Sequence, residues 1–172
     1  MRVLITGGCG FLGSNVASGL CKAGHQIQVF DNLSRAGSIE NLSWLQSNYD
    51  VSFIHGDIRN FTDVSTAVSN FLPDAVIHLA GQVAMTISID HPRLDFEINA
   101  HGTLNILEAL RIHCPGAFIA YSSTNKVYGD LEYLEYTETE SRYVTKAYPN
   151  GFNESLPLEF HSPYGCSKGA AE

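Results

Sequence analysis

Thr6-Gly7-Gly8-Cys9-Gly10-Phe11-Leu12-Gly13 follows the apolar run Val3-Leu4-Ile5 directly and opens a segment of helical spacing. At such a junction Gly7 permits a tight turn, Gly10 lets the backbone approach a pyrophosphate, and Gly13 allows close helix packing. The start of the following helix would face the anion. A glycine-rich turn without a ligand is the alternative. The order of strand, loop and helix disfavours it and predicts a dinucleotide site.

Similar apolar runs recur along the chain, and segments of helical spacing lie between them. The further runs are residues 27–30, 51–54, 75–79 and 117–121. They are nearly continuous rather than alternating, which is typical of a parallel sheet covered on both faces. The helical segments are residues 11–20, 39–45, 64–71 and 96–110, the last ending before Cys114-Pro115-Gly116. This alternation predicts an α/β protein with a Rossmann-type doubly wound parallel sheet.

The pattern changes after Gly129. Residues 130–161 are acidic, rich in tyrosine and aperiodic, with a turn signal at Pro149-Asn150-Gly151, so we expect no regular structure there. A new helix is predicted at Ser162-Pro163, with serine as the N-cap and proline at the first helical position. Since it has hardly begun at Glu172, we expect residues 1–172 to be one incomplete dinucleotide-binding domain, truncated before a C-terminal substrate domain.

Composition excludes several classes of function. The chain of 172 residues is 44% hydrophobic and 16% charged, with a formal net charge of −8 and a pI near 5.2, which argues against nucleic-acid binding. Its 4 cysteines and 7 histidines are scattered without metal-ligand spacing, so no metal or disulfide is expected. No stretch approaches the length of a membrane helix or a signal sequence. We expect a soluble, cytoplasmic protein with reduced thiols and a small-molecule or protein partner.

Acidic and amide residues follow the predicted strands. Asp31 ends the second run, where a carboxylate would accept hydrogen bonds from the adenine ribose of NAD, although Arg35 leaves NADP as an alternative. Asp57 follows the third run, where adenine would lie, or else it is an acid at a helix N-terminus. Leu79-Ala80-Gly81-Gln82 follows the fourth run, and its small residues would let a dinucleotide lie close to the backbone. Asn99 is either a support residue of the site or a buried polar residue.

Ser122-Ser123-Thr124 and Tyr164-Gly165-Cys166-Ser167-Lys168 together indicate a hydride-transfer site. Tyr164 and Lys168 are four residues apart, so they share one helix face. A free tyrosine is a poor base at neutral pH because its pKa is about 10, and a nearby ammonium favours the phenolate. Tyr164 would then take a proton from a sugar hydroxyl while hydride leaves the same carbon, and Thr124 would hydrogen-bond that oxygen.

These stretches, with Asp31-Asn32-Leu33-Ser34-Arg35 and Ser122 to Asp130, resemble the NAD-dependent epimerase/dehydratase family of extended short-chain dehydrogenases/reductases. Within that family they are similar to the members that epimerise C2 of a CDP-linked dideoxyhexose for O-antigen synthesis. The resemblance implies a keto-sugar intermediate formed by tightly held NAD, with no net redox change. It also implies a homo-oligomer, dimer or tetramer, of a full-length protein rather than of this chain alone, which is expected to be inactive with at most weak NAD binding.

The resemblance also assigns residues. Thr124, three residues before Val127-Tyr128-Gly129, forms the catalytic set with Tyr164 and Lys168. Substrate contacts are assigned to Gln82, Ser123, Thr124 and Asn125. Contacts with NAD are assigned to Gly7, Gly10, Phe11, Leu12, Gly13, Asp31, Asn32, Leu33, Ser34, Arg35, Asp57, Ile58, Leu79, Ala80, Gln82, Asn99, Ser122, Tyr164 and Lys168.

Three alternatives stay open on sequence alone. A nucleotide-sugar 4-epimerase uses the same scaffold. A 4,6-dehydratase does so too, but it needs an acidic pair beside the threonine, where this chain has Asn125-Lys126. A module that binds NAD without turnover is the alternative outside enzymes, and an intact Thr124, Tyr164 and Lys168 disfavour it.

Overall fold

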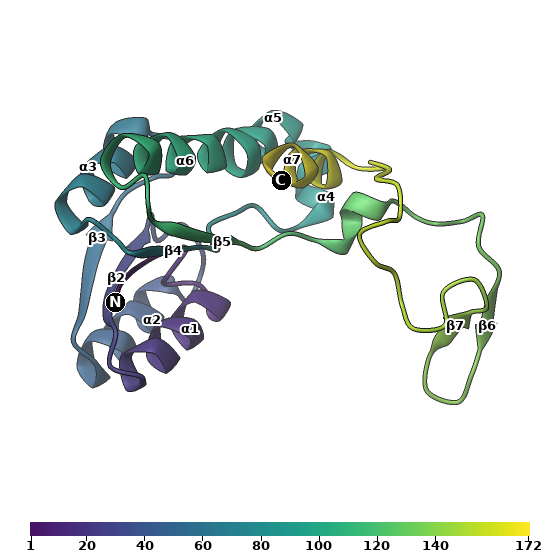
Figure 1. Cartoon of the computed structure of the whole chain (residues 1–172), viewed down its shortest axis with the longest axis horizontal. Helices are drawn as coiled ribbons and strands as arrows, with labels where there is room; N and C mark the ends of the chain where they lie inside the picture. Colours follow the sequence, from purple (N-terminus) through teal and green to yellow (C-terminus); the bar gives the residue numbers. More distant parts are fainter.

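The computed structural model describes all 172 residues as a five-stranded parallel sheet between two layers of helices, with a long arm at one end (Figure 1). The strand order is β3-β2-β1-β4-β5, so β3 and β5 form the edges and β1 lies in the centre. This is the Rossmann-type doubly wound sheet that the sequence predicts. The strands are β1 Arg2–Thr6, β2 Gln26–Asp31, β3 Val51–His55, β4 Ala75–His78 and β5 Phe118–Tyr121.

Two separate cores lie on the two faces of the sheet. Helices α1 (Phe11–Lys22) and α2 (Ser38–Asn48) cover one face, and α3 (Phe61–Phe71) and α6 (Gly102–His113) cover the other (Figure 1). In β1, Val3 and Ile5 belong to the first core and Leu4 to the second. Since successive side chains of a strand point to opposite faces, a sheet covered on both sides needs apolar residues at every position. That requirement explains the nearly continuous apolar runs.

The predicted helix over residues 96–110 is interrupted. Helix α5 (Pro92–Phe96) leads into a π-helical turn, η1 (Glu97–His101), and α6 continues from Gly102. A π turn inserts one residue without breaking the apolar periodicity of its flanks, so the sequence did not reveal it. The sequence also missed α4 (Met85–Asp90), whose six residues are too few for a periodic signal.

The prediction that residues 130–161, here called the arm, lack regular structure is wrong for six of them. Strands β6 (Tyr136–Glu138) and β7 (Tyr143–Thr145) pair antiparallel at the far end of the arm (Figure 1). All three residues of β6 are exposed, and Thr145 is the one buried residue of β7, so no alternating apolar pattern marks the hairpin. The predicted turn at 149–151 is present, with Gly151 at φ +93°.

Helix α7 (Pro163–Ala171) begins as predicted. The Ser162 hydroxyl accepts a hydrogen bond from the Gly165 amide at 3.0 Å, and Pro163 occupies the first turn. The helix packs against α4, α5, η1 and the 3₁₀ turn η2 (Asn125–Tyr128). It therefore lies beside the carboxyl end of β5. None of the helices has the length and hydrophobicity needed to cross a membrane.

His78 at the end of β4 links folding stability to pH. The side chain is 1% exposed, and its two ring nitrogens lie 2.5 Å from Thr6 Oγ1 and 3.0 Å from Thr103 Oγ1. Burial, and secondly the charge of Lys168, lowers the pKa of His78 to about 3. In the unfolded chain that pKa is about 6.5. Between these pH values only the unfolded chain binds the proton, so the folded chain loses stability as the pH falls.

Urea unfolding at pH 7 and pH 5 tests this linkage. Through His78, the free energy of unfolding should be about 2 kcal/mol lower at pH 5 than at pH 7. His78→Gln should reduce the difference between the two pH values by that amount, although the variant is less stable at pH 7. His91→Gln, at an exposed position, is the control. An H78Q variant with the wild-type pH dependence would show that His78 is not the linked group.

Candidate active site

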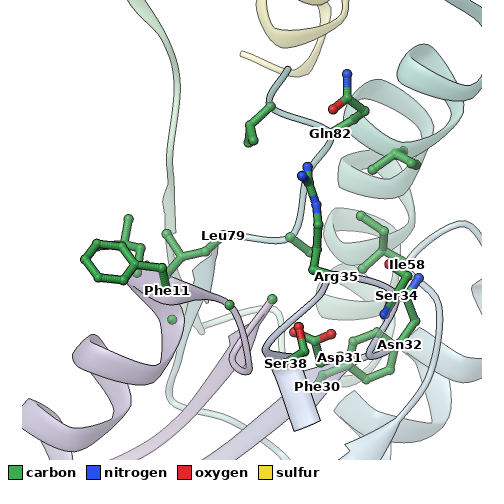
Figure 2. A pocket seen from close by; sticks show the side chains of 18 of the residues that line it. Phe11, Phe30, Asp31, Asn32, Ser34, Arg35, Ser38, Ile58, Leu79 and Gln82 are labelled. Atoms are coloured by element: carbon green, nitrogen blue, oxygen red, sulfur yellow. Dashed lines mark hydrogen bonds between the residues drawn. The ribbon is translucent and has the colours of Figure 1, made fainter. Parts of the chain in front are cut away.

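A cleft of about 720 Å³ opens at the carboxyl ends of β1, β2 and β4 (Figure 2). Its walls are the loop of residues 6–13, here called the glycine loop, the segment after β2, the segment after β3 and the residues that follow β4. The carboxyl ends of parallel strands meet at one edge of a sheet, which is where ligands of doubly wound folds bind. The cleft is therefore the candidate site for a dinucleotide.

Gly7 has no room for a side chain. Its φ is +68°, and a Cβ there would lie 2.7 Å from the Ala80 amide nitrogen and 2.8 Å from Ala80 Cα. Gly10 is the N-cap of α1 and supplies no side-chain cap, so the first amides of the helix keep their hydrogens for another acceptor. The loop therefore combines close backbone approach with an open helix N-terminus, and both features suit a pyrophosphate.

Asp31 is held by the glycine loop and by its own turn. One carboxylate oxygen accepts from the Cys9 amide at 3.0 Å and the other from the Leu33 amide at 2.8 Å. Carboxylate oxygens have further lone pairs for ribose hydroxyls. Arg35 also borders the cleft and takes part in none of the six salt bridges of the chain. In Figure 2 its side chain points toward the loop that carries Gln82.

Asp57, in the segment after β3, lines the cleft. The Arg59 guanidinium, 2.6 Å away, holds the pKa of Asp57 down at about 2, although partial burial opposes that shift. Asn32 Nδ2 donates to the same carboxylate at 3.2 Å. The ionised carboxylate thus joins the loops that follow β2 and β3.

The Gln82 loop, residues 79–84, lies opposite the glycine loop. The side chain of Gln82 bonds within this loop, since Nε2 donates to Ala84 O at 2.7 Å and Oε1 accepts from Ala84 N at 2.9 Å. Asn99 is 2% exposed and does not line the cleft. Its amide instead exchanges two hydrogen bonds with the Gln82 backbone, at 2.9 and 3.0 Å. Asn99 supports the loop from behind.

The segment after β5 contains the predicted catalytic hydroxyl. Thr124 caps η2 and its Oγ1 accepts from the Lys126 amide at 3.3 Å. Ser122 lines the cleft, whereas the Ser123 hydroxyl donates to the Glu172 carboxylate. Asn125 is exposed.

Helix α7 comes unusually close to this segment. A Cβ on Gly165 would lie 2.6 Å from the carbonyl oxygen of Lys126, so only glycine allows α7 to approach η2. Lys168 Nζ donates to the carbonyl of Ser122 and lies 4.1 Å from the centre of the Tyr121 ring. The structure thus brings Lys168 to the segment of Thr124. The hydroxyls of Tyr164 and Thr124 make no hydrogen bond to one another.

Lys168 has the electrostatic properties of a functional lysine. It is 4% exposed, and burial lowers its pKa to about 8, while the carboxylates of Glu172 and Asp95 act in the opposite direction. At neutral pH the ammonium form still predominates. Functional sites are enriched in such perturbed groups.

Most predicted contact residues border the cleft, and a few do not. Four of the predicted NAD contacts are outside its lining: Leu33, Asn99, Tyr164 and Lys168. The predicted substrate contacts Ser123, Thr124 and Asn125 are also outside it. Sequence reasoning missed several lining residues, although the position directly after a strand could have revealed Gly56. The missed residues are Phe30, Ala36, Ser38, Asn41, Gly56, Val83, Ile87 and Ile98, and Gly81 entered only as part of its motif.

Cys9 belongs to the glycine loop, and its thiol is shielded from solvent. Cys9 is fully buried, and burial, with Asp31 nearby, raises the pKa of its thiol to about 12. It is a packing residue in the core beneath α1. No group of three or more histidine, cysteine, aspartate or glutamate side chains is placed to hold a metal ion.

The chain is similar in sequence to enzymes that act on nucleotide sugars. The sequence matches the family model described as GDP-mannose 4,6 dehydratase over residues 4–172. It is 60% identical to the CDP-paratose 2-epimerase of Salmonella typhi over the whole chain and 51% of that protein. It is 33% identical to a dTDP-glucose 4,6-dehydratase of Mycobacterium tuberculosis over the whole chain and 47% of that protein.

The fold is shared with a solved structure that contains NAD. The UDP-glucose 4-epimerase of Thermus thermophilus in complex with NAD superposes with a TM-score of 0.79 and 34% identity, over 99% of this chain and 48% of that one. The chain therefore spans about half the length of the relatives it matches.

Proposed function

The chain belongs to the GDP-mannose 4,6-dehydratase family, and from that premise we propose that it forms the NAD-binding part of a nucleotide-sugar 2-epimerase. The proposed reaction inverts C2 of a CDP-linked dideoxyhexose, converting CDP-paratose to CDP-tyvelose, in the synthesis of O-antigen precursors. The observation that carries the proposal is the 60% identity with a CDP-paratose 2-epimerase along the entire chain. The other relatives support the wider class of nucleotide-sugar epimerases and dehydratases.

The cleft suits NAD for reasons of its own. Gly7 has no side chain between its backbone and that of Ala80, so a ligand can approach closely. The start of α1 offers amide hydrogens, and Asp31 offers oxygens for a ribose. A carboxylate at the end of β2 would repel the 2′-phosphate of NADP, so we propose NAD although Arg35 is nearby. When bound, NAD supplies a reversible acceptor for one hydride.

The residues beside the cleft would handle the proton. The phenolate of Tyr164 takes the proton of the sugar hydroxyl at C2 as the C–H electron pair leaves as hydride, which produces a 2-keto sugar. After the keto sugar rotates in the site, its other face would accept the hydride, and Tyr164 would return the proton to the oxygen. The sugar is therefore neither oxidised nor reduced overall. Lys168, which is buried and mostly protonated at neutral pH, would stabilise the phenolate. Thr124 would hydrogen-bond the reacting oxygen.

A homo-oligomer is part of the proposal. Leu104 and Leu107, which the sequence places on an apolar helix face, are exposed on the outer side of α6. Exposed leucines at helical spacing support burial against a second subunit.

The substrate assay tests the proposal directly. A protein of its relatives' length that carries this chain should invert CDP-paratose at C2, with product stereochemistry read by NMR, and should leave UDP-glucose unchanged. The sugar should keep its oxidation state and NAD should stay bound. Inversion of UDP-glucose at C4 would instead indicate a 4-epimerase, and loss of water would indicate a dehydratase.

A further inference from the structure

Asp95, near the end of α5, is a buried carboxylate that makes no salt bridge. It is fully buried and takes part in none of the six salt bridges. Removing a charged group from water is costly unless other interactions compensate for it, so an apolar residue would be the easier choice at this position. The hydrogen bonds around this carboxylate indicate what stabilises it there.

The hydrogen bonds of Asp95 join three segments of the chain, one of which, α7, is distant in sequence. One oxygen accepts from Gln82 Nε2 and from Asn99 Nδ2, both at 3.3 Å, and the other accepts from the hydroxyl of Ser167. These partners belong to the Gln82 loop at the cleft, to the π turn η1 and to α7. The carboxylate is thus the point at which the wall of the cleft meets the helix beside it.

Ser167 lies between the two predicted catalytic residues of α7. It is fully buried, follows Tyr164 by three residues and directly precedes Lys168. Its hydroxyl also accepts from Asn99 Nδ2 at 3.0 Å. No buried polar side-chain atom of the protein lacks a partner, so this network is fully satisfied. Such networks favour one arrangement of the elements they join.

We propose that Asp95 is a positioning residue that holds α7, with Tyr164 and Lys168, against the Gln82 loop. The carboxylate does so by accepting hydrogen bonds from both sides, which sets the depth of α7 relative to the cleft. Its negative charge also favours the ammonium form of Lys168. The inference rests on the proposed function for its consequence in catalysis, but the placement of α7 can be measured without turnover.

Two substitutions of Asp95 distinguish the loss of its hydrogen bonds from the loss of its charge. Asp95→Asn keeps the carbonyl oxygen that accepts from Gln82 and Asn99, and its new amide can donate to the Ser167 hydroxyl. Asp95→Ala removes every one of these bonds. Ser167→Ala breaks only the link to α7. Asp90→Ala, which removes an exposed carboxylate on α4, is the matched control.

Hydrogen–deuterium exchange and kinetics are measured on a protein of the relatives' length that carries this chain. In D95A the amides of residues 164–171 should exchange at least about 10-fold faster while those of α1 are unchanged, because the loss permits local opening of α7. The kcat per NAD-loaded enzyme should fall about 100-fold with KM within about 3-fold, the effect of a misplaced reacting group. S167A should change in the same direction, and D95N and D90A should stay within about 3-fold of wild type.

Several results would overturn the inference. Wild-type exchange of α7 in D95A would do so whatever the turnover, and so would a D95N as damaged as D95A. If D95A fails to fold, S167A decides, and an S167A with wild-type exchange and kcat rejects the role. Failure of the proposed function would give a different result. Tyr164→Phe would then leave activity unchanged, whereas the amide exchange of α7 would still increase in D95A.

Discussion

Tyr164→Phe should lower kcat about 1000-fold in a protein of the relatives' length that carries this chain, while bound NAD is retained. The magnitude is that of a lost general acid–base, since phenylalanine keeps the ring but cannot exchange a proton. Because Tyr164 is 8% exposed and its hydroxyl makes no hydrogen bond within the protein, removal of that hydroxyl should cost little stability. Turnover of CDP-paratose and NAD content after purification are the measurements.

The matched control is Tyr49→Phe, which also removes a phenolic hydroxyl. That hydroxyl accepts from Ser18 at 2.9 Å and lies away from the cleft, so Y49F should keep the wild-type kcat. Wild-type activity in Y164F would discard the assignment of Tyr164 and favour a module that binds NAD without turnover.

Gly7→Ala should weaken NAD binding about 100-fold, or about 2.7 kcal/mol, and destabilise the fold. Two effects add here: a left-handed backbone costs a residue with a Cβ about 1–2 kcal/mol, and the new Cβ would overlap the Ala80 backbone. Relief of that overlap must move the Gln82 loop away from the glycine loop, which changes the width of the cleft. Titration calorimetry with NAD and urea unfolding measure the two quantities.

Two other glycines separate these effects. Gly24 has φ +81° with nothing within 4 Å of a Cβ, so Gly24→Ala should lose stability by strain alone and bind NAD as the wild type does. Gly19 lies inside α1 with open space around it, so Gly19→Ala should gain about 0.5–1 kcal/mol. A G7A variant that resembles G24A in both measurements would refute the importance of the close approach to Ala80.

Local signals in the sequence predicted the parts of the site that lie on single loops. The glycine loop, Asp31 and Asp57 each follow a strand, and the carboxyl ends of parallel strands must meet at one edge of the sheet. Their convergence on the cleft follows from strand order alone. The cap at Ser162 was equally predictable, because a helix start depends on a few adjacent residues.

Other features depend on contacts that no short window of sequence contains. The π turn at η1 directs Asn99 toward the Gln82 loop, yet its residues have ordinary helical spacing. Leu104 and Leu107 belong to the apolar pattern that predicts the helix over residues 96–110, but the structure exposes them. Apolar periodicity identifies a helix face without indicating what covers it.

Local patterns of a few residues were sufficient to predict the sheet, the glycine loop and the candidate pair Tyr164 and Lys168. Folding alone determined that Asp95 meets Ser167, 72 positions away, and that Gly165 lets α7 reach η2. Such contacts depend on the distance at which one element packs against another. That distance is set by all the side chains between the packed layers, so no short stretch of sequence predicts it.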